Sequence, residues 1–482
     1  MSLSTALNIA QNSLLNTQRQ TNVVSRNIAN AYNDDYSRRS AVLSSLAPGA
    51  QVASIARATS AALFKQNLSA LSGWTAQSSL MDGLNQLNMS VNGVDNSNSP
   101  AVMIGKLQEA LQLYSSTPSN RTLGDNAVEA ARQVVKVLND GSDTLQRFRT
   151  DTDAQIAQAV GELNGYLAEF KKVNDEVIRG TIGGRDILDA LDRRDALLKK
   201  ISEYVPITTI TRSNNDLMLV TGDGSTLFET IPRHVSFEPT PAFGPATQGN
   251  GIRVDGVPLI NANGANTNAG GKLAAMVQLR DTYATGMQAQ LDETARGLIN
   301  AFSETDPGNP AIVRPGLFTW SGAPAMPADA TIEVGLAAMI SLNALIDPQQ
   351  GGNSEALRDG VNFDYNPDDH ASFTGRLIHM IQAMDAPLDF VSVDGTVAPR
   401  SLMNYSAATI SWLEDARQTA SVASENKNAL MVRTNEALSN VTSVNIDEEM
   451  TLMLQLEQSY AASAKMMQMI DEMLKTLMGI VR

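Results

Sequence analysis

The strongest repeating pattern of apolar residues lies at the end of the chain, in residues 446–482. Two series with a spacing of seven run through this segment: Met453, Tyr460, Met467, Leu474 and Val481, and Leu456, Ser463, Ile470 and Leu477. An apolar stripe this narrow is typical of the seam of a coiled coil. Asn445 is placed to cap the helix, and Asp447, Glu448 and Glu449 add favourable negative charge to its first turn. The pattern predicts one long helix that packs against a partner helix.

The beginning of the chain carries a second heptad pattern, built from smaller residues. Its two series are Leu7, Leu14, Thr21 and Ile28, and Leu3, Ala10, Thr17, Val24 and Ala31. Residues 1–57 have a net charge of +3, whereas residues 446–482 have a net charge of −3. Because the two ends match in spacing and are opposite in charge, we expect them to pair. Residues 1–58 and 443–482 are therefore predicted to form one coiled-coil domain.

Between these ends the period of the pattern changes. Residues 59–205 have helical spacing and are expected to begin a helical bundle. Short apolar runs separated by Asn, Asp and Gly turns identify 206–271 as an inserted β module. Helical spacing returns in 272–305 and 373–442, on either side of an irregular insertion with short strands at 306–372. The predicted fold is mainly α with an inserted β module, in which the terminal coiled coil and the helical bundle are both discontinuous.

Composition narrows the range of functions. The chain has 482 residues, 43% hydrophobic but only 5% aromatic, which suits helices packed through small side chains. Its net charge of −15 argues against nucleic acid or an anionic membrane as a partner, because both would repel it. It contains no cysteine, so neither disulfides nor thiol chemistry are expected. No apolar stretch is long enough to span a membrane, and the first residues do not resemble a cleaved secretory signal.

No catalytic or metal-binding pattern stands out. The three histidines include His370, which follows two aspartates, but no third or fourth ligand has zinc-like spacing. Asp192 and Asp195 alternate with Arg193 and Arg194 on a predicted helix, which is typical of a solvated face. The chain also lacks a G-x-S-x-G nucleophile motif. We therefore expect no enzymatic activity, no cofactor and no metal.

Short motifs at the two ends resemble the signatures of a known family. The N-terminal motif is Asn27-Ile28-Ala29-Asn30 followed by Tyr36-Ser37-Arg38, and the C-terminal motif is Val444-Asn445-Ile446-Asp447-Glu448-Glu449-Met450. Both are similar to the terminal signatures of the flagellar rod, hook and hook-associated axial proteins. There is one departure, because Tyr32-Asn33-Asp34-Asp35 stands where the family usually has a Pro-Gly turn. Asn and Asp still favour a turn here.

The helical middle favours one branch of this family. Hook and rod proteins are mainly β between their terminal helices, whereas residues 101–204 are predicted to be helical. The segment 186–198 also resembles a stretch of the subunits that join hook to filament. The resemblance implies a self-assembling structural subunit of that junction. A hook or rod subunit remains an alternative, and so does a secreted coiled-coil adhesin or effector.

The resemblance also implies partners and a location. The expected partners are further copies of the chain, the hook protein, a second junction protein, filament-side subunits and an export chaperone. The expected location is the extracellular flagellum, reached by type III export without a cleaved signal peptide.

Overall fold

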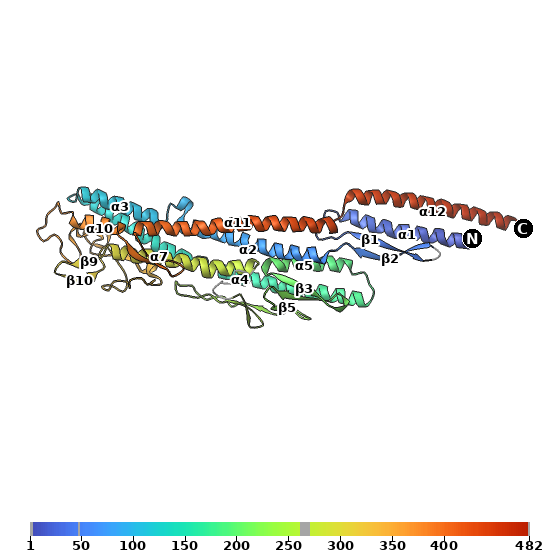
Figure 1. The fold of residues 1–482 in the computed structure, drawn as a ribbon, viewed down its shortest axis with the longest axis horizontal. Helices are drawn as coiled ribbons and strands as arrows, with labels where there is room; N and C mark the ends of the chain where they lie inside the picture. Colours follow the sequence, from blue (N-terminus) through green and yellow to red (C-terminus); the bar gives the residue numbers. More distant parts are fainter. Residues whose placement is uncertain (1–2, 47–48, 261–269, 481–482) are drawn as a thin grey trace. The chain divides into compact units, whose positions relative to one another are not determined.

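The computed structural model describes residues 3–46, 49–260 and 270–480 and divides the chain into two compact units (Figure 1). Unit 1 consists of Met1–Ser72, Gly165–Pro232 and Lys427–Arg482. Unit 2 consists of Gly73–Asn164 and Arg233–Asn426. Both units are therefore discontinuous in sequence, as the hydrophobic pattern predicts for the fold. Three long helices, α2, α4 and α11, contribute residues to both.

Unit 1 contains both ends of the chain. Its elements are α1 (Leu3–Ala29), β1 (Arg39–Leu46), β2 (Gly49–Arg57), the start of α2 (Ala61–Asn92), the end of α4 (Arg121–Ile182), α5 (Leu188–Tyr204), β3 (Ile207–Thr211), the 3₁₀ turn η2 (Ser213–Asn215), β4 (Leu217–Thr221), β5 (Thr226–Phe228), the end of α11 (Leu402–Thr442) and α12 (Ile446–Ile480). Helices α1 and α12 lie side by side and antiparallel, and the β1–β2 hairpin lies along α1 (Figure 1).

The β1–β2 hairpin is absent from the sequence prediction, which assigned its residues to the coiled-coil domain. The strands pair antiparallel, with Arg39 opposite Arg57 at one end, and the register shifts after Val42. The backbone N–H of Val52 donates a hydrogen bond of 3.0 Å to the buried Asn16 side chain of α1. The hairpin escaped detection because its strands are rich in Ser and Ala, which give neither a clear alternation nor a β-branched run.

The core of the remaining part of unit 1 lies between helices α4 and α5 and a three-stranded sheet. Strands β3, β4 and β5 are antiparallel and consecutive in the sheet. Leu219 and Phe228 are fully buried, and the Phe228 ring packs edge-on against Phe170 of α4, with 5.0 Å between the ring centroids. Buried aromatic pairs of this kind stabilise a fold beyond their area alone.

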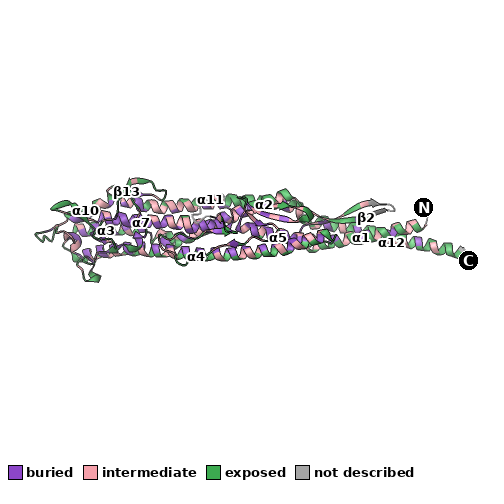
Figure 2. Cartoon of the chain, turned by 90° about the horizontal axis from the view of Figure 1, so that it is seen from below, coloured by how far each residue is buried: buried purple, intermediate pink, exposed green. Residues whose placement is uncertain are grey.

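Unit 2 is a helical bundle decorated with short strands. Besides the shared helices it contains η1 (Val94–Asn96), α3 (Pro100–Ser116), β6 (Val235–Ser236), β7 (Ile252–Val254), β8 (Val257–Ile260), α6 (Lys272–Gln278), the π-helical turn η3 (Leu279–Tyr283), α7 (Ala284–Ala301), β9 (Glu304–Asp306), β10 (Asn309–Arg314), β11 (Phe318–Thr319), α8 (Leu336–Met339), β12 (Ser341–Leu342), η4 (Pro348–Gln350), α9 (Ala356–Asp359), α10 (Gly375–Asp385), β13 (Leu388–Val391) and β14 (Val397–Arg400). Its apolar core joins α2, α3, α4, α7, α10 and α11. Figure 2 shows these helices with buried residues along their inner faces.

The segment 206–271 does not form one inserted module. Strands β3, β4 and β5 belong to unit 1, whereas β6, β7 and β8 form a separate three-stranded sheet in unit 2. In unit 2 the Asn164 side chain exchanges two hydrogen bonds with the backbone of Val235, of 2.8 and 3.1 Å. The two sheets thus divide because each is tied to a different stretch of α4. Residues 261–269, near the end of the predicted module, lie outside the described residues.

Candidate functional site

The two terminal motifs meet in unit 1 at Asn27, near the end of α1. Its side-chain amide donates to the carbonyl oxygen of Arg39 (2.8 Å) and to the carboxylate of Glu449 (3.0 Å). Its side-chain oxygen accepts from the hydroxyl of Tyr36 (2.8 Å) and from the backbone N–H of Arg39 (3.1 Å). Asn27 is fully buried and uses every donor and acceptor that an amide side chain offers. It therefore joins helix α1, the loop after it, the hairpin and helix α12.

The loop between α1 and the hairpin turns as the sequence predicts. The N–H of Tyr36 donates to the carbonyl oxygen of Asn33 (3.0 Å), and the N–H of Asp35 donates to the Asn33 side chain (3.1 Å). An asparagine side chain that bonds the backbone two residues on is a common way to fix a turn without glycine. The turn directs Tyr36 back onto Asn27.

Glu449 lies on the first turn of α12 and is only 1% exposed. Besides the Asn27 bond, it forms an ion pair of 2.7 Å with the Nε of Arg38. Asn445 caps the helix, and its side chain accepts from the N–H groups of Asp447 (3.0 Å) and Glu448 (3.4 Å). A buried carboxylate near a helix N-terminus also benefits from the positive end of the helix dipole. We call Asn27, Tyr36, Arg38, Arg39 and Glu449 the terminal clasp.

A row of carboxylates on α5 extends the terminal clasp. Arg39 contacts Asp189 (2.5 Å) and Asp192 (3.0 Å). Arg57, opposite Arg39 in the hairpin, contacts Asp192 (2.7 Å) and Asp195 (2.5 Å). Two arginines directly across a hairpin would repel each other, and the three carboxylates, each three residues apart on one helix face, neutralise them. We call Asp189, Asp192 and Asp195 the acidic row.

The expectation of a solvated face at residues 192–195 is wrong. Asp192 and Arg194 are both buried. Burial raises the pKa of Asp192, although Arg57 and Arg39 oppose that effect. Burial also lowers the pKa of Arg194 to about 10, where it remains charged at neutral pH, and its guanidinium donates to the Asn174 side chain (3.0 Å) and the Asn215 carbonyl (2.6 Å). Charge alternation could not reveal the burial of Asp192, because the hairpin whose arginines contact this carboxylate was not predicted.

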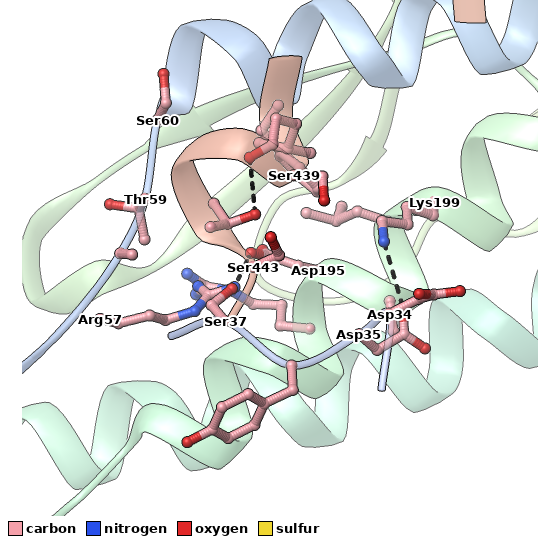
Figure 3. A pocket seen from close by; sticks show the side chains of 18 of the residues that line it. Asp34, Asp35, Ser37, Arg57, Thr59, Ser60, Asp195, Lys199, Ser439 and Ser443 are labelled. Carbon is pink, nitrogen blue, oxygen red and sulfur yellow. Dashed lines mark hydrogen bonds and ion pairs between the residues drawn. The ribbon is translucent and has the colours of Figure 1, made fainter. Parts of the chain in front are cut away.

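A pocket of about 420 Å³ lies beside the clasp, within unit 1 (Figure 3). Side chains converge on it from the loop after α1, from α5, from the start of α2 and from the end of α11. Lys199 reaches across it to Asp35, at 3.3 Å. Its charged groups are of both signs and largely paired with one another. The pocket therefore presents no concentrated charge for a small ionic ligand.

The described part of the chain gives no sign of a metal site or a membrane span. Among the described residues, no group of three or more His, Asp or Glu side chains could hold a metal ion. The side chains of His370 and Asp368 are mostly exposed and 4.0 Å apart. No helix within residues 3–46, 49–260 and 270–480 combines the length and apolar character needed to cross a bilayer.

The predicted seam residues are distributed unevenly over the α1–α12 contact. On α12, Leu456, Ser463 and Ile470 are buried, Met453, Met467 and Leu474 are half-buried, and Tyr460 and Leu477 are exposed. On α1, Val24 is buried, and Leu3, Leu7, Leu14 and Ile28 are half-buried. Val481 lies outside the described residues. The hydroxyl groups of Ser13 and Ser463 are 2.8 Å apart. The hairpin covers part of α1, so its buried face is broader than the heptad pattern indicates.

The remaining motif residues surround the clasp without joining it. Ser37 is buried, Ala29 is exposed, and the side-chain amide of Asn30 donates to the carbonyl oxygen of Arg26 in α1 (2.9 Å). Asp447 and Glu448 are exposed on the first turn of α12.

Two family models match the chain. The model described as the flagellar hook-associated protein FlgK helical domain matches residues 84–307. The model described as the flagellar basal body rod FlgEFG protein C-terminal matches residues 439–480. The first falls mainly on the bundle of unit 2, and the second covers α12 and Glu449.

Relatives and a solved structure agree with these matches. Flagellar hook-associated protein 1 of Salmonella typhimurium is 26% identical over 250 residues, which cover 47% of this chain and 43% of the relative. The Bacillus subtilis protein of the same name is 20% identical over 423 residues, 81% of this chain and 78% of the relative. The hook junction protein FlgK from Burkholderia pseudomallei has a similar fold, with a TM-score of 0.55 and 12% identity, over 77% of this chain and 99% of that one. The first alignment thus spans less than half the length of the Salmonella protein.

Proposed function

Because the chain belongs to the flagellar rod, hook and hook-associated proteins, we propose that it is the structural subunit that joins the hook to the filament. The observation that carries this proposal is the match of residues 84–307 to the helical domain of hook-associated proteins, combined with chain ends that fold back onto one another. A helical middle separates this chain from hook and rod subunits, which share the terminal motifs.

In this proposal the paired chain ends form the assembling part of the molecule. The terminal clasp fixes α1, the hairpin and α12 to one another, so that each copy offers its neighbours a preformed surface. That surface includes exposed apolar residues of α12, whose outer side is largely exposed in Figure 2: Met450, Leu454, Tyr460, Met466, Met469, Met473, Leu477 and Met478. Exposed apolar residues gathered on one element commonly mark an interaction surface.

The proposed partners follow from this role. They are further copies of the chain, the hook protein on one side, and a second junction protein with filament-side subunits on the other. We also propose that an export chaperone shields the exposed face of α12 before assembly, and that the chain is exported without a cleaved signal peptide. No step of this role requires catalysis, a cofactor or a metal.

A deletion strain tests the proposal. Removing the gene is expected to leave hooks that carry no filaments and to abolish swimming, and expression of the intact chain is expected to restore both. Loss of the hook as well would favour a hook or rod subunit. Normal filaments and motility in the deletion strain would contradict the proposal and favour a secreted adhesin or effector.

A further inference from the structure

The exposed side of α1 is mainly polar. Leu15 is the large apolar residue exposed on this helix among its described residues, with 55% of its surface accessible. Arg19 lies one turn further along and is also exposed. Within the described residues Arg19 forms no ion pair. Leu15 and Arg19 therefore form a small patch, one apolar group beside one cation, that the described part of the chain leaves uncovered.

Helix α12 carries a patch with the opposite charge. Glu457 is exposed, and within the described residues it forms no ion pair. The exposed ring of Tyr460 lies one turn away on the same helix. The patch on α12 is thus one aromatic group beside one anion, complementary to the patch on α1.

The two patches lie at the same height along the helix pair. The contacts Ser13–Ser463 and Asn27–Glu449 are separated by the same number of residues on both helices, so the antiparallel register is constant between them. Arg19 follows Ser13 by six residues, and Glu457 precedes Ser463 by six residues. The two charges are therefore level, because both helices rise about 1.5 Å per residue.

The two level charges cannot reach each other within one chain. With about 100° of rotation per residue, Arg19 and Glu457 each lie about 100° around their helix from the side that faces the partner helix. Because the helices are antiparallel, the two side chains leave the pair on opposite sides. One copy therefore presents a cationic patch on one side and an anionic patch on the other.

The geometry points to a second copy of this chain as the occupant of both patches. Placed alongside without axial shift, the α1 patch of one copy (Leu15 and Arg19) meets the α12 patch of the next (Tyr460 and Glu457). Leu15 lies two residues beyond Ser13, and Tyr460 lies three residues before Ser463, so these two side chains also lie at nearly the same height. The apolar contact and the ion pair can therefore form at the same time. Two different patches in contact make a heterologous interface, which repeats into a ring or helix. This inference rests on the proposed function, since it requires that copies assemble.

Charge-reversal substitutions test the interface. In the deletion strain, Arg19→Glu and Glu457→Arg are each expected to remove most filaments, because like charges then face each other at every interface. Co-expressing the two variants is expected to restore filaments to near the wild-type number, since alternating copies recover both ion pairs. The double variant in one chain is expected to behave in the same way. Lys465→Glu serves as the matched control and is expected to retain filaments. Lys465 is exposed on α12 and lies at the same height along the helix pair as the neutral Gln11.

Crosslinking gives a second measurement that does not depend on filament number. The chain contains no cysteine, so introduced thiols react without background. A mixture of Arg19→Cys and Glu457→Cys chains in isolated flagella is expected to give crosslinked dimers with a short bismaleimide. Either variant alone is expected to give few crosslinked dimers. A mixture of Arg19→Cys and Lys465→Cys chains is also expected to give few.

The outcomes separate the two proposals. If the deletion strain keeps its filaments, the proposed function fails. Suppose instead that the deletion removes filaments. The interface is then overturned, and the proposed function stands, if the single charge reversals leave filament number unchanged. The same holds if co-expression of the two variants gives no more filaments than either variant alone. Dimers from Arg19→Cys alone would also overturn the interface, because they would place α1 against α1. Secreted amounts and circular dichroism of each variant establish that the chains fold and are exported.

Discussion

The side chains of Asn27 and Glu449 are separated by 422 residues in the sequence and joined by a hydrogen bond of 3.0 Å. Both side chains are buried, and each lies in one of the two terminal motifs. The bond sits where α1 ends and α12 begins, so it fixes the position at which the two chain ends meet. Two residues far apart in the sequence, which no local pattern relates, therefore hold α1 and α12 together.

Replacing Asn27 is expected to loosen both ends of the chain. Asn27→Ala removes the hydrogen-bond partner of the buried Tyr36 hydroxyl, of the Arg39 backbone and of one carboxylate oxygen of Glu449, which costs on the order of 3 kcal/mol. Hydrogen exchange measured by mass spectrometry is expected to show roughly hundredfold faster exchange at the end of α1 and the start of α12. Asn30→Ala is the matched control, since the Asn30 side chain donates to the carbonyl oxygen of Arg26 at an exposed position. Equal effects of the two substitutions would contradict the role given to Asn27.

The acidic row is expected to hold the hairpin in place. Asp192→Ala removes the carboxylate shared by Arg39 and Arg57 and leaves two buried guanidinium groups less neutralised, which costs about 3–5 kcal/mol. Limited proteolysis is expected to cut the hairpin before other parts of unit 1. Glu176→Ala breaks the exposed pair with Arg193 and serves as the control, with an expected cost below about 1 kcal/mol. A hairpin that stays protected in Asp192→Ala would show that the hairpin is held by other contacts.

The sequence predicted the fold class because the helices carry strong local periodicity. It also placed the cap at Asn445 and the turn at Asn33, since short polar side chains bond their own backbone there. It did not reveal the hairpin or the burial of Asp192. Those features depend on one another, because Asp192 is buried by Arg39 and Arg57, and their strands have little apolar pattern of their own. Asn27 and Glu449 both belong to the terminal motifs, which were recognised by resemblance. Only the folded chain shows that their side chains form a hydrogen bond.

The sheet β3–β4–β5 is expected to be part of the core of unit 1 rather than a removable insertion. Phe228→Ala removes the ring that packs against Phe170 and leaves a cavity, which costs about 3–5 kcal/mol. Urea unfolding followed by circular dichroism, together with hydrogen exchange in β4 and α5, measures this effect. Ile231→Ala, at an exposed position three residues away, is expected to change stability by less than about 0.5 kcal/mol. A small effect of Phe228→Ala would show that the sheet β3–β4–β5 does not contribute to the core of unit 1.

Introducing an aspartate at two adjacent positions of α12 is expected to have different effects on the protection of α1. Ile470 is 7% exposed and Met469 is 54% exposed. Ile470→Asp places a carboxylate in the contact with α1 and is expected to speed exchange along α1 in the unassembled chain. Met469→Asp is expected to leave α1 protected there, since its side chain points to solvent. Protection of α1 in Ile470→Asp would mean that the hairpin, and not α12, stabilises this helix.

The position of the chain along the flagellum separates a junction subunit from a hook, rod or surface protein. A peptide epitope inserted in the exposed loop after Asp368, detected by immunogold labelling of isolated flagella in the electron microscope, reports that location. The proposed function predicts gold confined to a narrow band between hook and filament. Gold along the entire hook, within the rod, or on the cell surface away from flagella would contradict it.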